Sequence, residues 1–262
     1  MLNKVFNEDC IETMNRIDSE SIDLIVADPP YNIGKDYKNG SDKQSRESYL
    51  RFITNQIEGY YRILKPNGSL IIYTGKQFNP YYHIEIEKYM TIQNNIIWFY
   101  DSSGVQAKTK YGSLYEPIIF ATKHNKKYCF NIEEAQIESY TGSVRKLLDY
   151  RKNPPQPYNS KKNCGDVWYF PRVRYRMPEY TPHPTQKPLS ICERIIKVHS
   201  NEGDLVYIPF GGSGSEIITC IKNNRNFISS ELNKDYIENF INPRILDIQK
   251  KGFKKKKKKK KK

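Results

Sequence analysis

Residues 26–32 read Val-Ala-Asp-Pro-Pro-Tyr-Asn and follow the mainly apolar residues 22–25. Because proline has a fixed φ and no backbone N–H, two consecutive prolines predict that a buried β-strand ends here and that its last residues are held rigidly. Ligands of open α/β sheets bind at the carboxyl ends of the strands. We therefore expect Asp28 and the residues after it to lie at the ligand-binding edge of such a sheet.

Side chains in this stretch have the chemistry to hold a planar base that carries an exocyclic amine. The Asp28 carboxylate and the proline carbonyls accept hydrogen bonds, and the Tyr31 ring offers a flat stacking surface. Two acceptors on the amine hydrogens would localise the nitrogen lone pair and make the amine a better nucleophile. The residues alone also allow a simpler interpretation, in which a rigid turn follows the strand and Asp28 caps a neighbouring segment.

The remaining pattern is typical of a sheet covered by helices. Apolar residues recur at helical spacing in some segments, whereas β-branched and aromatic residues form short runs in others. This alternation favours an α/β domain with a mostly parallel sheet. The expected helices are 10–17, 44–64 and 78–90, with residues 66–68 ending the second, and the expected strands are 3–9, 22–26, 69–73, 96–100 and 117–122.

Composition sets limits on the class of protein. The net charge is +14, but nine of the 43 Lys and Arg residues form the run 254–262, and the other 34 exceed the 29 acidic residues by five. This balance is compatible with a polyanionic partner, and we expect 251–262 to be a disordered tail. The five cysteines form no CxxC pair, so neither disulfides nor a metal site are expected. With no signal peptide and no long apolar segment, we expect a cytoplasmic protein without a membrane span.

The Asp-Pro-Pro-Tyr sequence resembles motif IV of the DNA amino-methyltransferases, which use S-adenosylmethionine (AdoMet) to methylate adenine or cytosine. The resemblance implies a doubly wound, mostly parallel seven-stranded sheet, the Rossmann-like fold of AdoMet-dependent methyltransferases. It also implies that Asp28 and the Pro29 carbonyl accept hydrogen bonds from the target amine while Tyr31 stacks on the base. The predicted catalytic residues are Asp28, Pro29, Pro30 and Tyr31.

Two further segments resemble cofactor-binding parts of the same family. Asp9 is a natural cap for the helix that follows it, and the resemblance implies that Asp9 and Cys10 contact the adenine ring of AdoMet. Residues 183–188, His-Pro-Thr-Gln-Lys-Pro, are expected to open a helix whose free N–H groups, with Lys187, would seat a carboxylate. The resemblance places Thr185 and Lys187 beside the methionine end of AdoMet.

A glycine-rich turn at 210–215, Phe-Gly-Gly-Ser-Gly-Ser, follows a predicted strand and precedes a predicted helix. Glycines permit a tight turn and a close approach of the backbone to a ligand, although such turns also serve nucleotides in general. The spacing differs from that of a P-loop and resembles the FxGxG motif of AdoMet sites. The predicted cofactor contacts here are Phe210, Gly211, Gly212, Gly214 and Ser215.

Two acidic positions bear on the same cofactor. Glu231 ends a predicted strand about twenty residues after the first glycine, the distance at which a ribose-binding carboxylate follows a βαβ unit. Many relatives carry an acid two residues before the phenylalanine of the turn, where this chain has Ile208. The methionine amine of AdoMet would then be held by backbone carbonyls or by Asp28.

Segments rich in basic and aromatic residues are candidates for contact with DNA. Residues 123–180 mix arginine and lysine with tyrosine and tryptophan, which suits phosphate binding, guanine recognition and base stacking. By position this stretch matches the family's target-recognition region. Residues 101–116 are either a flexible loop near DNA or an ordinary exposed linker, and the polar residues 32–42 are either a flap over the site or an inert loop. The predicted DNA contacts are Lys108, Lys110, Arg172, Arg174 and Arg176.

The order of the motifs is typical of the β group of this family, in which the catalytic tetrad precedes the insert and the glycine-rich turn follows it. We therefore expect a catalytic domain formed by 1–122 and 181–250, an insert at 123–180, and an adenine-specific DNA methyltransferase that uses base flipping and belongs to a restriction-modification system. Its partners would be double-stranded DNA and, as open alternatives, a second copy and a cognate restriction endonuclease. Methylation of the cytosine 4-amino group and a catalytically silent DNA-binding subunit are the competing hypotheses.

Overall fold

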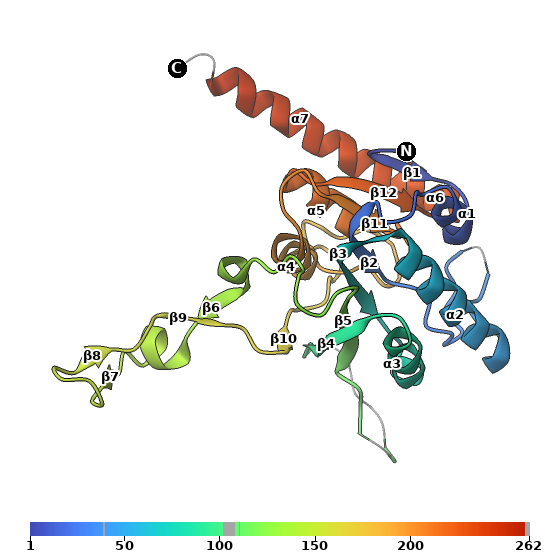
Figure 1. Ribbon diagram of the computed structural model, residues 1–262. Helices are drawn as coiled ribbons and strands as arrows, with labels where there is room; N and C mark the ends of the chain where they lie inside the picture. Colours follow the sequence, from blue (N-terminus) through green and yellow to red (C-terminus); the bar gives the residue numbers. More distant parts are fainter. Residues whose placement is uncertain (39, 102–107, 110, 260–262) are drawn as a thin grey trace.

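The computed structural model describes residues 1–38, 40–101, 108–109 and 111–259, with side chains described as far as residue 250. Within these residues, eight strands form one sheet in the order β1-β12-β11-β2-β3-β5-β4-β10 (Figure 1). Only β5 runs antiparallel to its neighbours. The strands are β1 (Lys4–Phe6), β12 (Asn226–Ser230), β11 (Leu205–Ile208), β2 (Ile22–Ala27), β3 (Leu64–Tyr73), β5 (Tyr115–Thr122), β4 (Thr91–Phe99) and β10 (Val167–Tyr169).

Helices cover both faces of this sheet, which confirms the doubly wound α/β prediction. Each face has its own apolar core, one built on α1 to α3 and the other on α4, α5 and the segment after α6. The two cores exist because the parallel strands are apolar on both sides. The helices are α1 (Cys10–Asn15), α2 (Arg46–Ile63), α3 (Asn79–Glu87), α4 (Leu189–His199), α5 (Ser215–Lys222) and α6 (Lys234–Tyr236), and the π-helix Ile237–Ile241 follows α6.

The strand count differs from the prediction of seven. The eighth strand is β10, which lies within residues 123–180 and pairs in parallel with β4, Trp168 opposite Trp98. Trp168 is buried and its indole N–H donates to the Gly165 carbonyl, 2.9 Å away. Part of the predicted insert is therefore integrated into the central sheet, because a three-residue aromatic run is sufficient to extend an exposed sheet edge.

Element boundaries follow the local chemistry closely, with one correction. Ser45 caps α2 by accepting from the Ser48 N–H, and Pro29 and Pro30 end the pairing of β2 as expected. Residues 66–68, predicted to separate the second helix from the next strand, instead lie inside β3, which begins directly after α2. The pairing with β2 is irregular here, since Ile22 faces Leu64 and the register shifts before Leu24.

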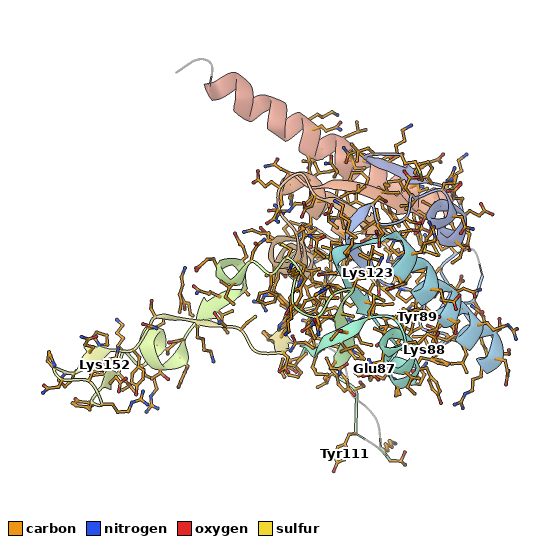
Figure 2. The ribbon with its side chains drawn as sticks, viewed as in Figure 1. Glu87, Lys88, Tyr89, Tyr111, Lys123 and Lys152 are labelled. Atoms are coloured by element: carbon orange, nitrogen blue, oxygen red, sulfur yellow. The ribbon has the colours of Figure 1, made fainter. Side chains whose placement is uncertain are left out.

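An arm extends away from the sheet between β5 and β10 (Figure 1). It begins after the 3₁₀ helix Ile132–Ala135 and contains β6 (Gln136–Glu138), the π-helix Tyr140–Val144, β7 (Leu148–Asp149), β8 (Gln156–Pro157) and β9 (Lys161–Asn163). Its strands form two separate two-stranded sheets. Side chains of the arm point outward on all sides in Figure 2, so most of its basic and aromatic groups are open to solvent.

The chain end also differs from the prediction. Helix α7 (Asn242–Lys259) continues into the lysine run that we expected to be disordered, and it projects beyond the sheet in Figure 1. Lysine is a good helix former, and the run contains no proline, so the helix passes through Gly252 and continues into the run. Among the described helices, none is long and apolar enough to cross a membrane.

We predict that Gly142→Ala destabilises the arm. A Cβ at Gly142 would lie 2.1 Å from the backbone oxygen of Asn159, and relieving such overpacking costs about 1–3 kcal/mol. Hydrogen exchange should therefore become faster in residues 136–163 and stay unchanged in the central sheet. Gly165→Ala is the matched control, because nothing lies within 4 Å of its added Cβ. Equal protection of the arm in both variants would contradict the prediction.

Candidate active site

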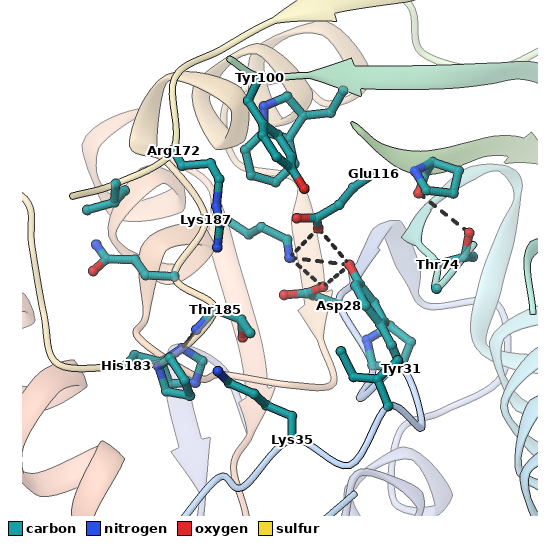
Figure 3. Close-up of a pocket in the computed structure, with 18 of the residues that line it drawn as sticks. Asp28, Tyr31, Lys35, Thr74, Tyr100, Glu116, Arg172, His183, Thr185 and Lys187 are labelled. Atoms are coloured by element: carbon teal, nitrogen blue, oxygen red, sulfur yellow. Dashed lines mark hydrogen bonds and ion pairs between the residues drawn. The ribbon is translucent and has the colours of Figure 1, made fainter. Parts of the chain in front are cut away.

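The carboxyl end of β2 borders a cavity of about 440 Å³ (Figure 3). Asp28 and Tyr31 reach it from the turn after β2, and Lys187 reaches it from the segment before α4. Glu116 lies near the start of β5, and because β5 is antiparallel its amino end meets the carboxyl end of the parallel strands. Four polar side chains from distant parts of the sequence therefore converge at one edge of the sheet.

The Lys187 ammonium is the centre of this cluster. Its Nζ lies 2.9 Å from Asp28 Oδ1 and 3.1 Å from Glu116 Oε2, and it donates to the Tyr31 hydroxyl at 3.3 Å. The Tyr31 hydroxyl in turn lies 2.9 Å from Asp28 Oδ1 and 3.0 Å from Glu116 Oε2. Since Lys187 is only 4% exposed, these partners replace the water that would otherwise stabilise its charge.

Burial and charge together set the protonation of the cluster. Burial raises the pKa of Asp28, while Lys187 lowers it and Glu116 raises it. Burial opposes the charge on Lys187, but the two carboxylates hold its pKa above the ordinary value. Burial and the same carboxylates raise the pKa of Tyr31, so its hydroxyl stays protonated and can donate. The ionised state of Asp28 therefore depends on Lys187.

Aromatic side chains and close backbone packing shape the walls of this cavity. The Tyr31 carbonyl accepts from Gln77 Nε2 at 3.2 Å, and a Cβ on Gly75 would lie 2.9 Å from Tyr31 Cβ. Tyr31 therefore has little freedom to move. Trp98 and Tyr100 line the same cavity and pack edge to face, with ring centroids 5.2 Å apart. A carboxylate among aromatic rings suits a planar, amine-bearing ligand.

The two prolines of the tetrad have different surroundings. The Pro30 carbonyl accepts from the buried Tyr49 hydroxyl at 2.6 Å, which ties the turn to α2. Pro29 lines the first cavity and Pro30 the second. Of the two carbonyls, that of Pro29 is therefore the one suited to a ligand in the first cavity.

A second cavity, of about 370 Å³, lies beside the first. It is lined by Asp28 and Pro30 from the turn after β2, and by Phe210 and Gly212 from the glycine-rich turn after β11. The turn with Pro29 and Pro30 and the glycine-rich turn at 210–215 thus meet at one edge of the sheet. The sequence predicted that both turns bind ligands. The loop 32–42, which we call the flap, also borders this cavity through Tyr37, Gly40, Ser41 and Asp42.

Glu231 anchors the glycine-rich turn. Its Oε2 accepts from the Gly212 N–H at 2.7 Å, and its Oε1 accepts from the Asn233 N–H at 2.8 Å. Gly212 has a φ of 49°, and a Cβ there would lie 3.2 Å from the His183 imidazole. Burial, with the positive charges of Lys187 and Lys35, lowers the pKa of His183 to about 3, so this ring is neutral.

The lining of the second cavity also combines a carboxylate with aromatic surface. Asp9 caps α1 by accepting from the Ile11 N–H at 2.8 Å, and Cys10 is held by the Tyr207 hydroxyl, which donates to its carbonyl at 2.8 Å. Phe210 packs near Phe52, with ring centroids 6.4 Å apart. Asp9 thus caps the helix and also lines the second cavity, while its contact with AdoMet stays a prediction.

The two cavities share a wall. Asp28, Tyr37, His183 and Thr185 line both of them. Tyr37 is positioned by two contacts, a hydrogen bond between its side chain and Thr185 and one from Asn233 Nδ2 to its carbonyl at 2.9 Å. Ligands in the two cavities would therefore meet beside Asp28.

Several predicted cofactor residues have roles in the scaffold. Lys187 points to Asp28 in the first cavity and does not line the second, which differs from the predicted seat for a carboxylate. The helix also begins later than expected, since α4 starts at Leu189. Gly211 donates to the Ser230 carbonyl, Gly214 adopts a φ of 80° before α5, and the buried Ser215 hydroxyl donates to the Lys187 carbonyl. These residues shape the turn without lining the cavity.

The side chain of Ile208 belongs to the core. It is 1% exposed and packs with the helices on one face of the sheet, so this position offers no acid to the second cavity. Among the described residues, no group of three His, Cys, Asp or Glu side chains could hold a metal ion.

The predicted DNA contacts lie in different surroundings. Arg172 lines the first cavity, with its guanidinium 5.2 Å from the centroid of the Tyr100 ring. Arg174, Arg176 and Lys108 are exposed, whereas Lys110 lies outside the described residues. Among the predicted DNA contacts that the structure describes, Arg172 is therefore the one that lines a cavity of the site.

Sequence reasoning missed Glu116 and gave Tyr37 no separate role. Glu116 stands just before an apolar run, which could have indicated a polar residue at an end of a strand. Glu116 reaches the site only because β5 runs antiparallel to its neighbours, and the sequence did not reveal that direction. Tyr37 was seen only as part of a polar loop. No local feature of the flap indicates that its tyrosine lies between two cavities.

Comparisons with known proteins agree with this geometry. A family model described as DNA methylase matches residues 22–242. The chain is 45% identical to the DNA adenine methyltransferase YhdJ of Escherichia coli (strain K12), over 89% of the chain and 80% of that enzyme. It is 36% identical to the type II methyltransferase M.HpaI of Haemophilus parainfluenzae, over 87% of the chain and 69% of that enzyme. The crystal structure of the M1.HpyAVI-SAM complex has a TM-score of 0.60 at 25% identity and covers 90% of this chain and 96% of its own.

We predict that Lys187→Met lowers the free energy of unfolding by about 3–5 kcal/mol at neutral pH, because it leaves two largely buried carboxylates, 20% and 18% exposed, without their counter-charge. The pKa of Asp28 should rise further above its value in the unfolded chain. The folded state then binds protons more tightly than the unfolded state, so stability falls as pH rises. Denaturant unfolding should therefore show a smaller deficit near pH 5 than near pH 7.

Lys197→Met is the matched control. Lys197 pairs with Glu134 at 2.6 Å, where the side chains are 32% and 43% exposed, and such pairs contribute about 1 kcal/mol or less. A deficit for Lys187→Met that is equally small, or that does not change with pH, would contradict the prediction.

Proposed function

The chain belongs to the DNA methylase family, and we propose that it transfers a methyl group from AdoMet to the 6-amino group of adenine in DNA. The observation that carries this proposal is the position of Asp28 where two cavities meet. One cavity suits a planar, amine-bearing base, and the other has the groups that suit a nucleoside. The similarity to an enzyme named as a DNA adenine methyltransferase supports adenine as the target.

The residues of the second cavity fit AdoMet. A carboxylate has about four lone-pair sites, so Glu231 can accept ribose hydroxyls in addition to its two backbone N–H groups. Asp9 and Phe210 suit the amino group and the ring of an adenine, and Gly212 allows close approach of the backbone. AdoMet would supply a methyl group activated by its sulfonium. Asp28 and backbone carbonyls are the groups available for its methionine amine, because Ile208 is buried.

The first cavity would orient the target amine. Lys187 and Tyr31 both contact Oδ1 of Asp28, so Oδ2 is the acceptor we assign to one amine hydrogen, and the Pro29 carbonyl is the acceptor for the other. The ring of Tyr31 would stack on the base. Asp28 is also the nearest carboxylate for the proton that the amine gives up. Positioning and electrostatics account for the rate in this scheme, since no covalent enzyme intermediate is required.

DNA would be held along basic surfaces outside the cavities. The target base must leave the helix to reach Asp28, so we propose base flipping. Arg172 at the cavity wall would contact the displaced nucleotide, and the exposed Lys108, Arg174 and Arg176 would contact the backbone. We propose that the arm within the insert 123–180 also contacts the DNA backbone, and that 1–122 and 181–250 form the catalytic unit.

Two competing hypotheses make different predictions for the same assay. A cytosine 4-amino group presents similar hydrogens to Asp28, so the chemistry of the tetrad alone allows it. A silent subunit would have no physical reason to keep both the Asp28–Lys187 cluster and a cavity anchored by Glu231. The type II description of M.HpaI supports a restriction-modification system for this chain too. A cognate endonuclease, a homodimer and a cytoplasmic location belong to the same proposal.

We expect Asp28→Ala to abolish methyl transfer while the protein stays folded. The assay incubates unmethylated genomic DNA with radiolabelled AdoMet, digests the DNA and identifies the labelled nucleoside. The wild type should give N6-methyladenine, whereas label in 4-methylcytosine would overturn the adenine assignment. Near-normal activity of Asp28→Ala would refute the role of Asp28, and an inactive wild type that binds DNA would favour the silent subunit.

We expect Glu231→Gln to weaken AdoMet binding about tenfold or more, because the amide loses charge and one acceptor oxygen that a buried polar ligand needs. Isothermal titration with AdoMet measures this directly, without DNA. Glu202→Gln is the matched control, since Glu202 is exposed and remote from both cavities. Unchanged affinity in Glu231→Gln would remove Glu231 from the cofactor site.

A further inference from the structure

Glu116 is a second, partly buried carboxylate in the first cavity, and the proposed methyl transfer gives it no task. Its Oε2 accepts hydrogen bonds from Lys187 Nζ at 3.1 Å and from the Tyr31 hydroxyl at 3.0 Å. Its side chain is 18% exposed and lines the same cavity as Tyr100. A carboxylate placed 3.0–3.1 Å from groups that also bind Asp28 must influence how those groups share their protons.

Hydrogen-bond capacity shows what Glu116 does for Asp28. Lys187 has three N–H donors and Tyr31 has one O–H donor. In the part of the chain that the structure describes, both groups contact Asp28 through Oδ1 and Glu116 through Oε2. The single Tyr31 proton can serve one carboxylate at a time. Without Glu116, every donor in the cluster would turn to Asp28, and its second oxygen would be occupied as well.

We propose that Glu116 is a positioning residue that shares Lys187 and the Tyr31 hydroxyl with Asp28, so that one Asp28 oxygen stays open for the amine of the target base. This inference rests on the proposed methyl transfer to an amine. Glu116 contacts neither the cofactor cavity nor the assigned amine acceptors. It acts through Lys187 and Tyr31.

Glu116 also sets the ionisation of Asp28. Its negative charge disfavours a second negative charge nearby, and Lys187 offsets this by lying between the two carboxylates. Removal of the Glu116 charge should therefore make Asp28 easier to ionise, because the repulsion is lost and Lys187 is left with Asp28 alone. Among the described residues, the other titratable groups that interact electrostatically with Asp28 are Tyr31, Tyr37, Tyr73, from α2 Tyr49, from α3 Tyr82 and from α5 Glu216.

The test is Glu116→Gln, with Glu116→Asp as the variant that keeps the charge. We expect kcat to fall about 10- to 100-fold in Glu116→Gln, while the KM for AdoMet and the affinity for AdoMet alone stay at the wild-type value. The acidic limb of kcat against pH should move to lower pH. In Glu116→Asp the limb should stay near its wild-type position. Glu87→Gln is the control, since Glu87 lies on α3 and is 60% exposed.

A readout independent of turnover follows the Asp28 carboxyl by carbon NMR in the free protein, assigned by comparison with Asp28→Asn. Its titration should shift to lower pH in Glu116→Gln. An unshifted titration together with wild-type kcat would overturn the inference, as would a loss of AdoMet affinity, which would indicate a structural role. If the wild type transfers no methyl group to DNA, the proposed function fails and this inference falls with it.

Discussion

The active site depends on the burial of one ammonium group between two carboxylates. Lys187 is almost inaccessible to solvent, and a lone charge in that position would be strongly disfavoured. Asp28 and Glu116 make its burial possible, and Lys187 in return limits the rise in the pKa of Asp28 that burial causes. Lys187 therefore balances both carboxylates, and the Tyr31 hydroxyl joins the three groups at hydrogen-bond distance.

The topology of the sheet brings these groups into contact. Asp28 follows the parallel strand β2, and Glu116 lies near the start of the antiparallel strand β5. The carboxyl end of β2 and the amino end of β5 therefore lie at the same edge of the sheet. β3 separates β2 from β5 in the sheet, and Lys187 bridges the resulting gap from the segment before α4. The same edge holds the turn after β11, which places the second cavity beside the first. Asp28 borders both cavities because β2 lies between β11 and β3.

Much of the fold and of the site could be predicted from the sequence, because the features that decide them act within a few residues. Asp9, Pro29, Pro30 and the glycines of 211–214 restrict backbone geometry or cap a helix through their own chemistry, so their structural roles are visible in the residues themselves. Hydrophobic periodicity likewise predicted α2. Runs of β-branched and aromatic residues predicted the central strands, and the spacing between two of these runs left room for α3. The errors lie where neighbours in space decide the outcome, as in β10, whose three residues extend the sheet only because β4 offers an open edge.

The sequence by itself determined the fold class, the place of the Asp28 turn at the edge of the sheet and the segments that line the second cavity, because proline, glycine and apolar periodicity act over a few residues. Only the tertiary structure decided that Lys187 pairs with Asp28, that Glu116 belongs to the site, and that Tyr37 lies between the cavities. The direction of a charged side chain depends on which opposite charge is buried next to it. That partner can lie 71 residues away, as Glu116 does from Lys187.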